Sequence, residues 1–458
     1  MNKIALYVAG DENIVGPALI FLNSVKKYNN FIDLYIFTEL EKTETKLIEC
    51  AKSKGIECLS ICELNNIDAN YISNFSQMGR WPKYVFYNWI APTYFYKKKY
   101  SYAIKADYDM LCLDKLDMDE ILPSEREAIS VLPKGLMTGK LDEECLQKIK
   151  NNLNLNLPNG ARSANVRLVA FNLKKWIMLD LQKSFLEIYN LLQKEQNLRA
   201  SAIKGETIEQ AAFGCLQGKI NSKFKALSPK FNFRPIFESP EYSPVIVHFN
   251  TGIKPWNDLN VEQATRAQLN GLNIVSHIFL FILWHTAAKE LCEESLNIDI
   301  VDKLKNNALS VNRNVNKIIE NVRSKDNENF RKWILQDLRA SIDRSSLNKI
   351  NWKVDRSYRW LQVPISRDGN LHYEISLCDE GGGTVKIVVH FEREWTLRLD
   401  LFNKLLLIEL PGADLIKHQT QGKGELGYML KEINTLLATQ VFLSLRDQLS
   451  PQFKKEKI

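Results

Sequence analysis

Hydrophobic positions in the first part of the chain alternate between short apolar runs and stretches with helical spacing. Continuous apolar runs of this length are typical of buried parallel strands, and an apolar residue every three or four positions is typical of a helix packed on a sheet. The strand–helix alternation predicts a doubly wound α/β fold with a mostly parallel sheet. The strands are expected at 4–9, 32–37 and 56–61, and the helices at 17–28 and 41–54.

The middle of the chain is less regular, but the same two patterns recur in it. An aromatic-rich segment predicts a helix at 82–96 that is bent or broken at Pro92, because proline removes a backbone donor. Most of its aromatic side chains are expected in the core. Strands are expected at 102–106, 166–172 and 245–249, a helix at 173–192, and loops at 151–162 and 250–256.

The pattern changes after about residue 259, where 261–338 is predominantly helical. His277 and His285 lie on its most apolar helix and are expected to be packing residues. A hairpin is expected from 371–378 and 384–391, and helices from 427–449. Gly381 to Gly383 are interpreted as the hairpin turn, because no lysine and helix follow them as in a phosphate-binding loop. We therefore expect domains at 1–258, 259–350 and 351–458, the last two forming a helical and then an α+β accessory region.

Composition narrows the class of protein. The chain has 458 residues, 45% of them hydrophobic, which is enough for two or three cores. A net charge of +7 suits phosphorylated ligands or an anionic membrane face, but it is too modest for a nucleic-acid partner. The eight cysteines form no Cys-x-x-Cys pair and predict free thiols in a reducing compartment. We expect a cytoplasmic protein, peripheral at most to the inner face of a membrane.

The chemistry-bearing motif that stands out is Asp107-Tyr108-Asp109, directly after the predicted strand 102–106. Ligands of open α/β sheets bind at the carboxyl ends of strands, and paired carboxylates with phosphate oxygens hold Mg²⁺ or Mn²⁺. Taken alone, two aspartates one residue apart are more often found in a plain solvated turn.

Three further pieces accompany this pair. Asn165 precedes the predicted strand that ends at Asn172. Glu209 and Gln210 begin a predicted helix, where the helix dipole alone would favour an acidic residue. His248 precedes Lys254-Pro255-Trp256 by six residues.

The order and spacing of these motifs over residues 1 to 258 resemble glycosyltransferase family 8, the retaining glycogenin and lipopolysaccharide galactosyltransferase group. The resemblance implies a GT-A fold, a Rossmann-like mixed sheet flanked by helices. It also implies Mn²⁺ or Mg²⁺ as cofactor and a nucleotide sugar, UDP-linked, as donor.

The resemblance also implies a role for each matching residue. Asp107, Asp109 and His248 would bind the metal, and Lys254 would neutralise the departing diphosphate. Asp11 and Asn13 would lie near the uridine, Asn165 would line the sugar pocket, and Glu209 and Gln210 would lie beside the anomeric carbon.

The chain departs from the family pattern around the sugar pocket. Arg167 stands where glycine is usual, and we expect it either to read an acidic sugar or to form an ion pair. Glu209 replaces an aspartate, and Ala211 replaces a second acid. Asn88 stands near the position of a donor-binding arginine, for which Lys83 is a candidate substitute.

The resulting expectation is a metal-dependent retaining glycosyltransferase that acts on a glycan or protein acceptor, in bacterial surface polysaccharide synthesis. The C-terminal region would serve acceptor recognition, homo-oligomer formation or membrane docking. Two alternatives stay open: a nucleotidyltransferase on a related sheet, and a non-catalytic module that binds a sugar nucleotide.

Overall fold

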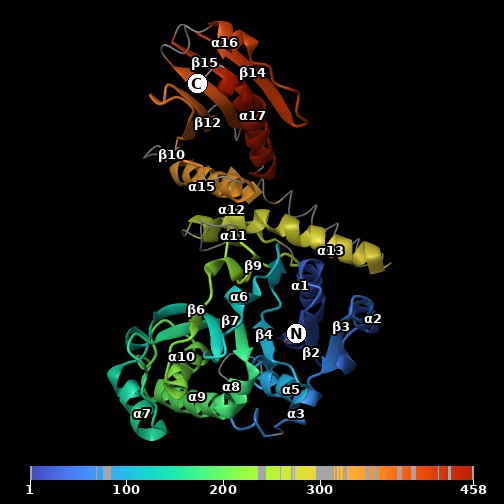
Figure 1. Cartoon of the computed structure of the whole chain (residues 1–458), viewed down its shortest axis with the longest axis vertical. Helices are drawn as coiled ribbons and strands as arrows, with labels where there is room; N and C mark the ends of the chain where they lie inside the picture. Colours follow the sequence, from blue (N-terminus) through green and yellow to red (C-terminus); the bar gives the residue numbers. More distant parts are fainter. Residues whose placement is uncertain are drawn as a thin grey trace. The chain divides into compact units, whose positions relative to one another are not determined.

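A computed structural model describes most of the chain, in two compact units that are treated separately below (Figure 1). The described residues are 3–68, 70–75, 84–235, 244–257, 259–269, 272, 274–295, 314, 317–318, 320–322, 327–346, 350–354, 359–378, 384–392, 399–420, 422–431 and 435–455. The first unit comprises Met1–Arg234, Pro244–Asn257 and Leu283–Asn307, and the second comprises Pro235–Ser243, Asp258–Ile282 and Ala308–Ile458. The division into three domains stays a prediction.

The first unit is built on a mixed sheet. Its strands lie in the order β3-β2-β1-β4-β7-β6-β8. The first four are parallel, whereas β7 runs antiparallel to both β4 and β6. The predicted α/β class is confirmed, and the antiparallel β7 makes the sheet mixed. The strands are β1 Ile4–Ala9, β2 Asp33–Thr38, β3 Ile56–Ser60, β4 Tyr102–Ala106, β6 Ile129–Leu136, β7 Arg162–Asn172 and β8 Lys225–Ala226.

Helices cover the sheet because its strands are apolar on both faces; every residue of β1 before Ala9 is buried. Helix α10 packs on β7 and also against α9 (Figure 1). The helices are α1 Val15–Tyr28, α2 Thr45–Ser53, α3 Cys62–Asn65, α4 Tyr84–Tyr87, α5 Ala91–Lys97, α6 Met118–Ile121, α7 Glu143–Leu153, α8 Leu173–Met178, α9 Leu181–Leu198, α10 Ile208–Ile220 and α13 Phe281–Ser295, with short 3-10 turns at Glu12–Ile14, Leu40–Lys42, Met137–Gly139 and Pro229–Phe231.

Several predicted helices are shorter than expected. The aromatic segment breaks just before Pro92 into α4 and α5, as its proline predicts. The helix expected at 173–192 is two helices, because Asp180 between them has a positive φ of 49°. Buried rings of the aromatic segment pack in the core; the ring of Trp89, for example, lies 4.9 Å from that of Phe213 of α10 between centroids.

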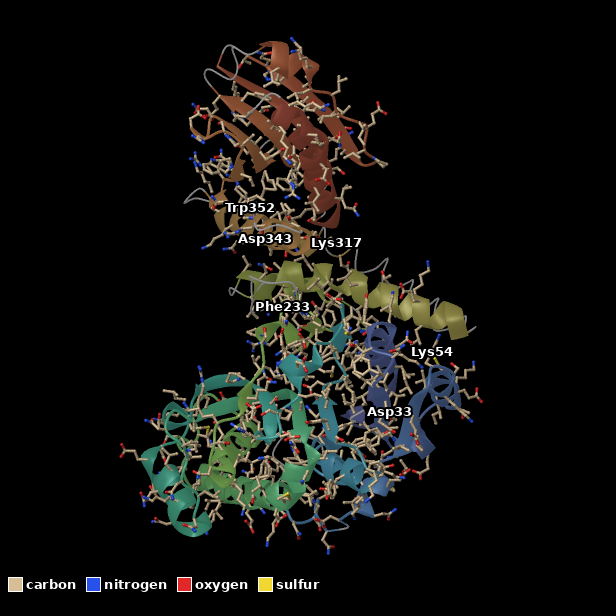
Figure 2. All side chains as sticks on the ribbon, in the orientation of Figure 1. Asp33, Lys54, Phe233, Lys317, Asp343 and Trp352 are labelled. Carbon is tan, nitrogen blue, oxygen red and sulfur yellow. The ribbon has the colours of Figure 1, made fainter. Side chains whose placement is uncertain are left out.

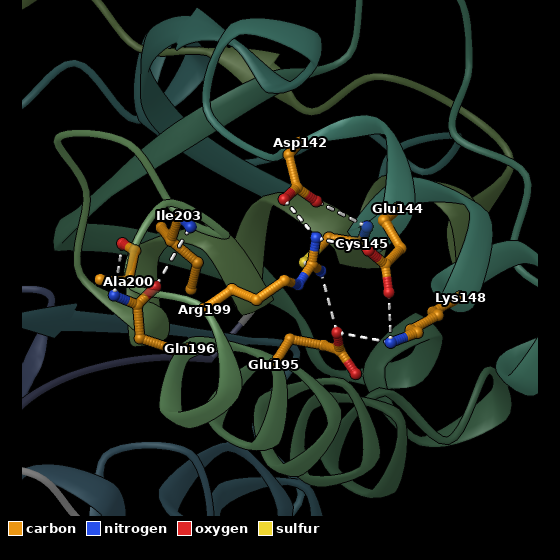
Figure 3. A network of polar contacts seen from close by, with 9 residues as sticks. All are labelled: Asp142, Glu144, Cys145, Lys148, Glu195, Gln196, Arg199, Ala200 and Ile203. Carbon is orange, nitrogen blue, oxygen red and sulfur yellow. Dashed lines mark hydrogen bonds and ion pairs between the residues drawn. The ribbon is translucent and has the colours of Figure 1, made fainter.

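A charged network ties α7 to the end of α9 (Figure 3). The Arg199 guanidinium lies 2.7 Å from Asp142, 2.7 Å from Glu144 and 2.9 Å from Glu195. Lys148 bridges Glu144 and Glu195 at 2.8 and 2.7 Å. Networks of several charges fix geometry better than isolated pairs, so this one holds α7 against α9, on which α10 packs.

The second unit contains a purely antiparallel sheet in the order β10-β11-β12-β13-β15-β14. The predicted hairpin is confirmed, with β12 at Leu371–Cys378 paired to β13 at Thr384–Glu392; its glycines lie outside the described residues. The other strands are β10 Lys353–Val354, β11 Trp360–Pro364, β14 Ala413–Gln419 and β15 Lys423–Leu430, and the helices are α11 Val261–Leu269, α12 Ile274–Phe279, α15 Asn327–Ser345, α16 Leu399–Lys404 and α17 Thr435–Lys455.

The helix expected at 427–449 is wrong at its start, because Gly427 to Leu430 complete β15 and α17 begins only at Thr435. Strand pairing on both sides, to β13 and β14, decides the structure of these residues. Helices α15 and α17 pack together, and the indole of Trp352 donates to Asp343 of α15 at 2.7 Å (Figure 2).

Two smaller expectations concern cysteines and membranes. The seven cysteines whose side chains the structure describes are free thiols, as predicted. Among the described helices, none combines the length and the apolar character needed to cross a bilayer.

His277 and His285 are both buried, and His285 contacts the carbonyl of Pro255 at 2.7 Å.

Candidate active site

The Asp-x-Asp pair lies where β4 ends. Asp107 to Asp109 connect β4 to the short strand β5, Met110–Cys112. Strand β5 pairs antiparallel with β9, Ile246–His248, and the register sets Met110 opposite His248. The ring nitrogen Nε2 of His248 consequently lies 3.0 Å from Asp109 Oδ1 and 3.7 Å from Asp107 Oδ2.

His248 is held in the form that a metal ligand needs. It is buried, and its Nδ1 lies 2.8 Å from Oδ1 of Asn232. Because an amide oxygen only accepts, Nδ1 donates to Asn232, and Nε2 is the ring nitrogen that faces the two carboxylates and could ligate a metal. The candidate ligand atoms of Asp107, Asp109 and His248 all lie within 4.8 Å of one another. Two carboxylates and one imidazole fit Mn²⁺ well and Mg²⁺ less well.

Lys254 reaches into the same cluster from the loop after β9. Its ammonium group bonds Asp109 Oδ2 and also donates to the carbonyl of Phe249 at 2.7 Å. Burial alone would raise the pKa of Asp109, but His248 and Lys254 outweigh it and hold that pKa well below the usual range. Asp109 is therefore an anion at any physiological pH.

A second lysine, Lys105, was not predicted. It lies on β4 with its side chain only 7% exposed, bonds Asp107 Oδ1, and donates to the carbonyl of Val166 at 2.9 Å. Each aspartate of the pair thus has its own ammonium partner. The available signal was a lysine inside an otherwise apolar strand, since a buried lysine requires an acceptor.

Glu209 and Gln210 begin α10, whose N-cap is Thr207. The indole of Trp89 donates to Glu209 Oε1 at 3.0 Å. Burial raises the pKa of Glu209 to about 7, with nearby Lys105 opposing the shift and Asp107 adding to it. Gln210 Oε1 accepts from Lys134 at 3.2 Å, and Lys134 is anchored by the buried Glu206 at 2.9 Å.

The other predicted pocket residues lie around this centre. Asn165 is buried on β7, where its side-chain oxygen accepts from the backbone N–H of Arg167 at 3.3 Å. The Arg167 guanidinium contacts the amide oxygen of Asn250, with Nη2 at 3.0 Å once that amide is turned to accept. Arg167 thereby connects β7 to the loop that follows His248.

Two positions expected near the nucleotide follow β1. Asp11 caps the turn at Glu12–Ile14 by accepting from the backbone N–H of Asn13 at 3.1 Å, and Asn13 is exposed. Asn88 is buried, and its amide donates to the carbonyl of Val85 at 3.0 Å. Lys83, the expected substitute for the family arginine, lies outside the described residues.

We expect Glu209→Gln to stabilise the protein at neutral and alkaline pH. A carboxyl with a folded pKa of about 7 and an ordinary value of 4.5 disfavours folding once it must ionise. The protonated carboxyl, which does not disfavour folding, is present in full below the ordinary pKa of 4.5 and is lost as pH rises through the folded pKa of about 7. Glutamine keeps the bond from Trp89, so its advantage in unfolding free energy should grow to about 3 kcal/mol at most by pH 8.

Urea unfolding at pH 5 and pH 8 measures this difference. The exposed Glu143→Gln is the matched control and should show almost no pH-dependent change. An equal stability difference between Glu209→Gln and wild type at both pH values would contradict the expectation.

A protein-family profile matches the chain in sequence. The sequence profile of "Glycosyl transferase family 8" matches residues 5–260, more than half of the chain. No curated protein matches the chain closely enough in sequence to count as a relative.

The solved structures that resemble the chain are distant from it in sequence. The bifunctional glycosyltransferase WbbM in its apo form has a TM-score of 0.42 and 11% identity, over 65% of this chain and 52% of that one. The galactosyltransferase LgtC with donor and acceptor sugar analogues has a TM-score of 0.38 and 14% identity, over 56% and 90%. GlyE from Streptococcus pneumoniae TIGR4, apo form, has 0.39 and 13%, over 66% and 64%. The chain spans about half the length of WbbM.

The profile match over residues 5–260 assigns the mixed sheet to the GT-A type and the chain to the glycosyltransferase class. The profile match assigns the family: the chain belongs to glycosyltransferase family 8, whose members retain anomeric configuration.

Proposed function

We propose that this protein is a metal-dependent retaining glycosyltransferase that takes its sugar from a nucleotide sugar, UDP-linked, and delivers it to a glycan or protein acceptor. The observation that carries the proposal is the convergence of Asp107, Asp109 and His248 with Lys254 on one strand end. The family match favours sugar transfer over the nucleotidyl transfer kept as an alternative.

These residues suit the departure of a nucleoside diphosphate. Asp107, Asp109 and His248 would hold Mn²⁺ or Mg²⁺, which supplies positive charge against the diphosphate. Lys254 would exchange its contact with Asp109 for a diphosphate oxygen, where negative charge grows as the glycosidic bond breaks. Asp11 and Asn13, after β1, would bind the nucleoside.

The start of α10 supports a front-face reaction. The amide of Gln210 is a poor nucleophile, and its oxygen is already bonded to Lys134. We therefore propose that the acceptor hydroxyl attacks on the face that the diphosphate leaves, and that a leaving phosphate oxygen takes the acceptor proton. Glu209, held by Trp89, would support positive charge on the sugar ring, and Asn165 would line the pocket.

The non-catalytic alternative differs in one measurable outcome. A pure binding module would bind a UDP-sugar without releasing UDP. Incubation with Mn²⁺ and donor, followed by analysis of the nucleotide product, distinguishes the three functions. Released UDP indicates transfer or hydrolysis, and a nucleoside monophosphate-sugar product indicates a nucleotidyltransferase. Unchanged donor indicates a binding module.

A donor panel tests the nucleotide specificity. UDP-, GDP- and CDP-sugars are compared by thermal unfolding with Mn²⁺ present, because binding to the folded state adds about 2.7 kcal/mol when the ligand is at 100 times its Kd. We expect a UDP-sugar to raise the melting temperature most, and the shift to shrink when Mn²⁺ is omitted. A larger shift with GDP- or CDP-sugars would contradict UDP as the nucleotide.

The proposed setting is the synthesis of a bacterial surface polysaccharide. The second unit would then serve acceptor recognition, homo-oligomer formation or contact with the inner face of a membrane, and a cytoplasmic location would follow from the intracellular supply of nucleotide sugars.

A further inference from the structure

The sheet of the second unit has one face covered by helices and one polar face. Tyr373 of β12 packs against Phe442 of α17, with ring centroids 5.9 Å apart, and its hydroxyl lies 3.1 Å from Ser450 of the same helix. Side chains alternate along a strand. His372 and Glu374, on either side of Tyr373, therefore lie on the opposite face.

Three metal-ligating side chains gather on that face. His372 and Glu374 are two residues apart on β12, and the strand register sets His390 of β13 directly opposite His372. The two imidazole rings stack with centroids 5.2 Å apart. All three residues are buried, with His372 only 2% exposed. They lie in the second unit, and the proposed transfer reaction uses none of them.

His372 is prepared as a ligand. Its Nδ1 lies 2.8 Å from the carbonyl oxygen of Gly369, so Nδ1 donates and Nε2 is the ring nitrogen that could ligate a metal. Nε2 is buried and makes no hydrogen bond in the described structure. The closest carboxylate oxygen is Glu374 Oε2 at 3.5 Å, which is long for a hydrogen bond.

The spacing fits a shared ion. One candidate ligand atom from each of His372, Glu374 and His390 lies within 4.8 Å of the others. Tetrahedral zinc with bonds of about 2.0–2.1 Å places its ligand atoms roughly 3.3–3.4 Å apart. The separation of 3.5 Å between His372 and Glu374 is close to that value, and Gln362 donates to Glu374 Oε2 at 3.1 Å, which orients the carboxylate.

The groups around these residues carry a net negative charge that a divalent cation would balance. Glu425 of β15 lies 3.4 Å from His390 Nδ1, and Glu392 lies 3.5 Å from His390 Nε2. Lys386 pairs with Glu425 at 2.8 Å. With neutral imidazoles, the carboxylates of Glu374, Glu392 and Glu425 outnumber this one ammonium group by two negative charges, which one divalent ion balances.

We propose that His372, Glu374 and His390 bind one divalent transition-metal ion of the zinc type, at a site separate from the Asp107 cluster. Two imidazole nitrogens and one carboxylate favour zinc over magnesium or calcium, which prefer all-oxygen sites. The ion links β12 to β13 on the polar face of the sheet, and its role is to stabilise the second unit.

The competing arrangement has no metal, with protonated histidines paired to Glu374, Glu392 and Glu425. Full-length protein distinguishes the two. It is stripped with a chelator, reloaded with Zn²⁺, desalted and analysed by elemental mass spectrometry. The background is Asp109→Asn with His248→Ala, so that the first cluster cannot contribute zinc.

In that background we expect about one zinc per chain, and about none after His372→Gln or His390→Gln. The matched control is His418→Gln, because His418 lies opposite Glu425 on the edge strand β14 but is exposed; it should retain zinc. No zinc in the background protein, or undiminished zinc in both histidine variants, would overturn the proposal.

A second measurement avoids variants of the second unit that fail to fold. X-ray absorption at the zinc edge, on the zinc-loaded background protein, should show about two histidine ligands in a four-coordinate shell. A shell of oxygen ligands without histidine scattering would overturn the proposal even if zinc is bound.

Discussion

Asp109→Asn is expected to lower Mn²⁺-dependent turnover by at least about 1,000-fold, equivalent to about 4 kcal/mol of transition-state stabilisation. The change removes the carboxylate that touches both His248 and Lys254, while the new amide is almost the same size. The backbone carbonyl of Asp109 still accepts from Phe249 at 2.8 Å, so the fold should persist. Release of UDP from a UDP-sugar at saturating Mn²⁺ measures the loss.

His248→Ala should have a comparable effect, because it removes the only nitrogen ligand of the proposed set. The matched control is Asp114→Asn, an exposed aspartate just beyond β5, which should keep wild-type turnover. Wild-type activity in Asp109→Asn or His248→Ala, with unchanged circular dichroism, would refute the ligand assignment.

Lys254→Ala is expected to lower turnover by about 100- to 1,000-fold, the usual effect of removing one group that meets developing charge. Since negative charge grows on the diphosphate mainly in the transition state, kcat should fall more than the donor KM rises. Steady-state kinetics with varied donor concentration gives both constants.

The control for lost positive charge is Lys219→Ala, an exposed lysine in the last turn of α10. An unchanged kcat in Lys254→Ala, or a change in KM alone, would assign Lys254 to holding Asp109 in place rather than to the leaving group.

The apolar strand before them marks Asp107 and Asp109 in the sequence, and the family resemblance adds His248 and Lys254; the structure brings these four side chains together, whereas Lys105 was not predicted. Asp107 and Asp109 follow β4, and His248 ends β9. The partner of His248 was missed: Asn232 follows a short 3-10 turn, and no local pattern marks it. Trp89 was expected to be a core residue, and only the fold shows that its indole also holds Glu209.

Errors in the fold arise where pairing partners decide the structure. Residues 427–430 have no strong local preference, and neighbouring strands on both sides make them part of β15. Strand β6 lies in a stretch with no clear sequence pattern. Its pairing to β7 is interrupted by register shifts, and such shifts break the regular alternation of side chains that a sequence pattern would show. The proximity of His372 and Glu374 on β12 to His390 on β13 likewise depends on the register between the two strands, which the spacing of these residues in the sequence does not reveal.

The pairing of Met110 with His248 has a consequence for the protein while it is being made. A ribosome adds about 5–20 residues per second, and Asp109 leaves it long before the chain reaches β9. With the proposed ligand set, the growing polypeptide carries both acidic ligands before the imidazole, so we expect metal-dependent transfer only after β9 has emerged and paired with β5. We therefore expect activity only from chains in which β5 and β9 have paired.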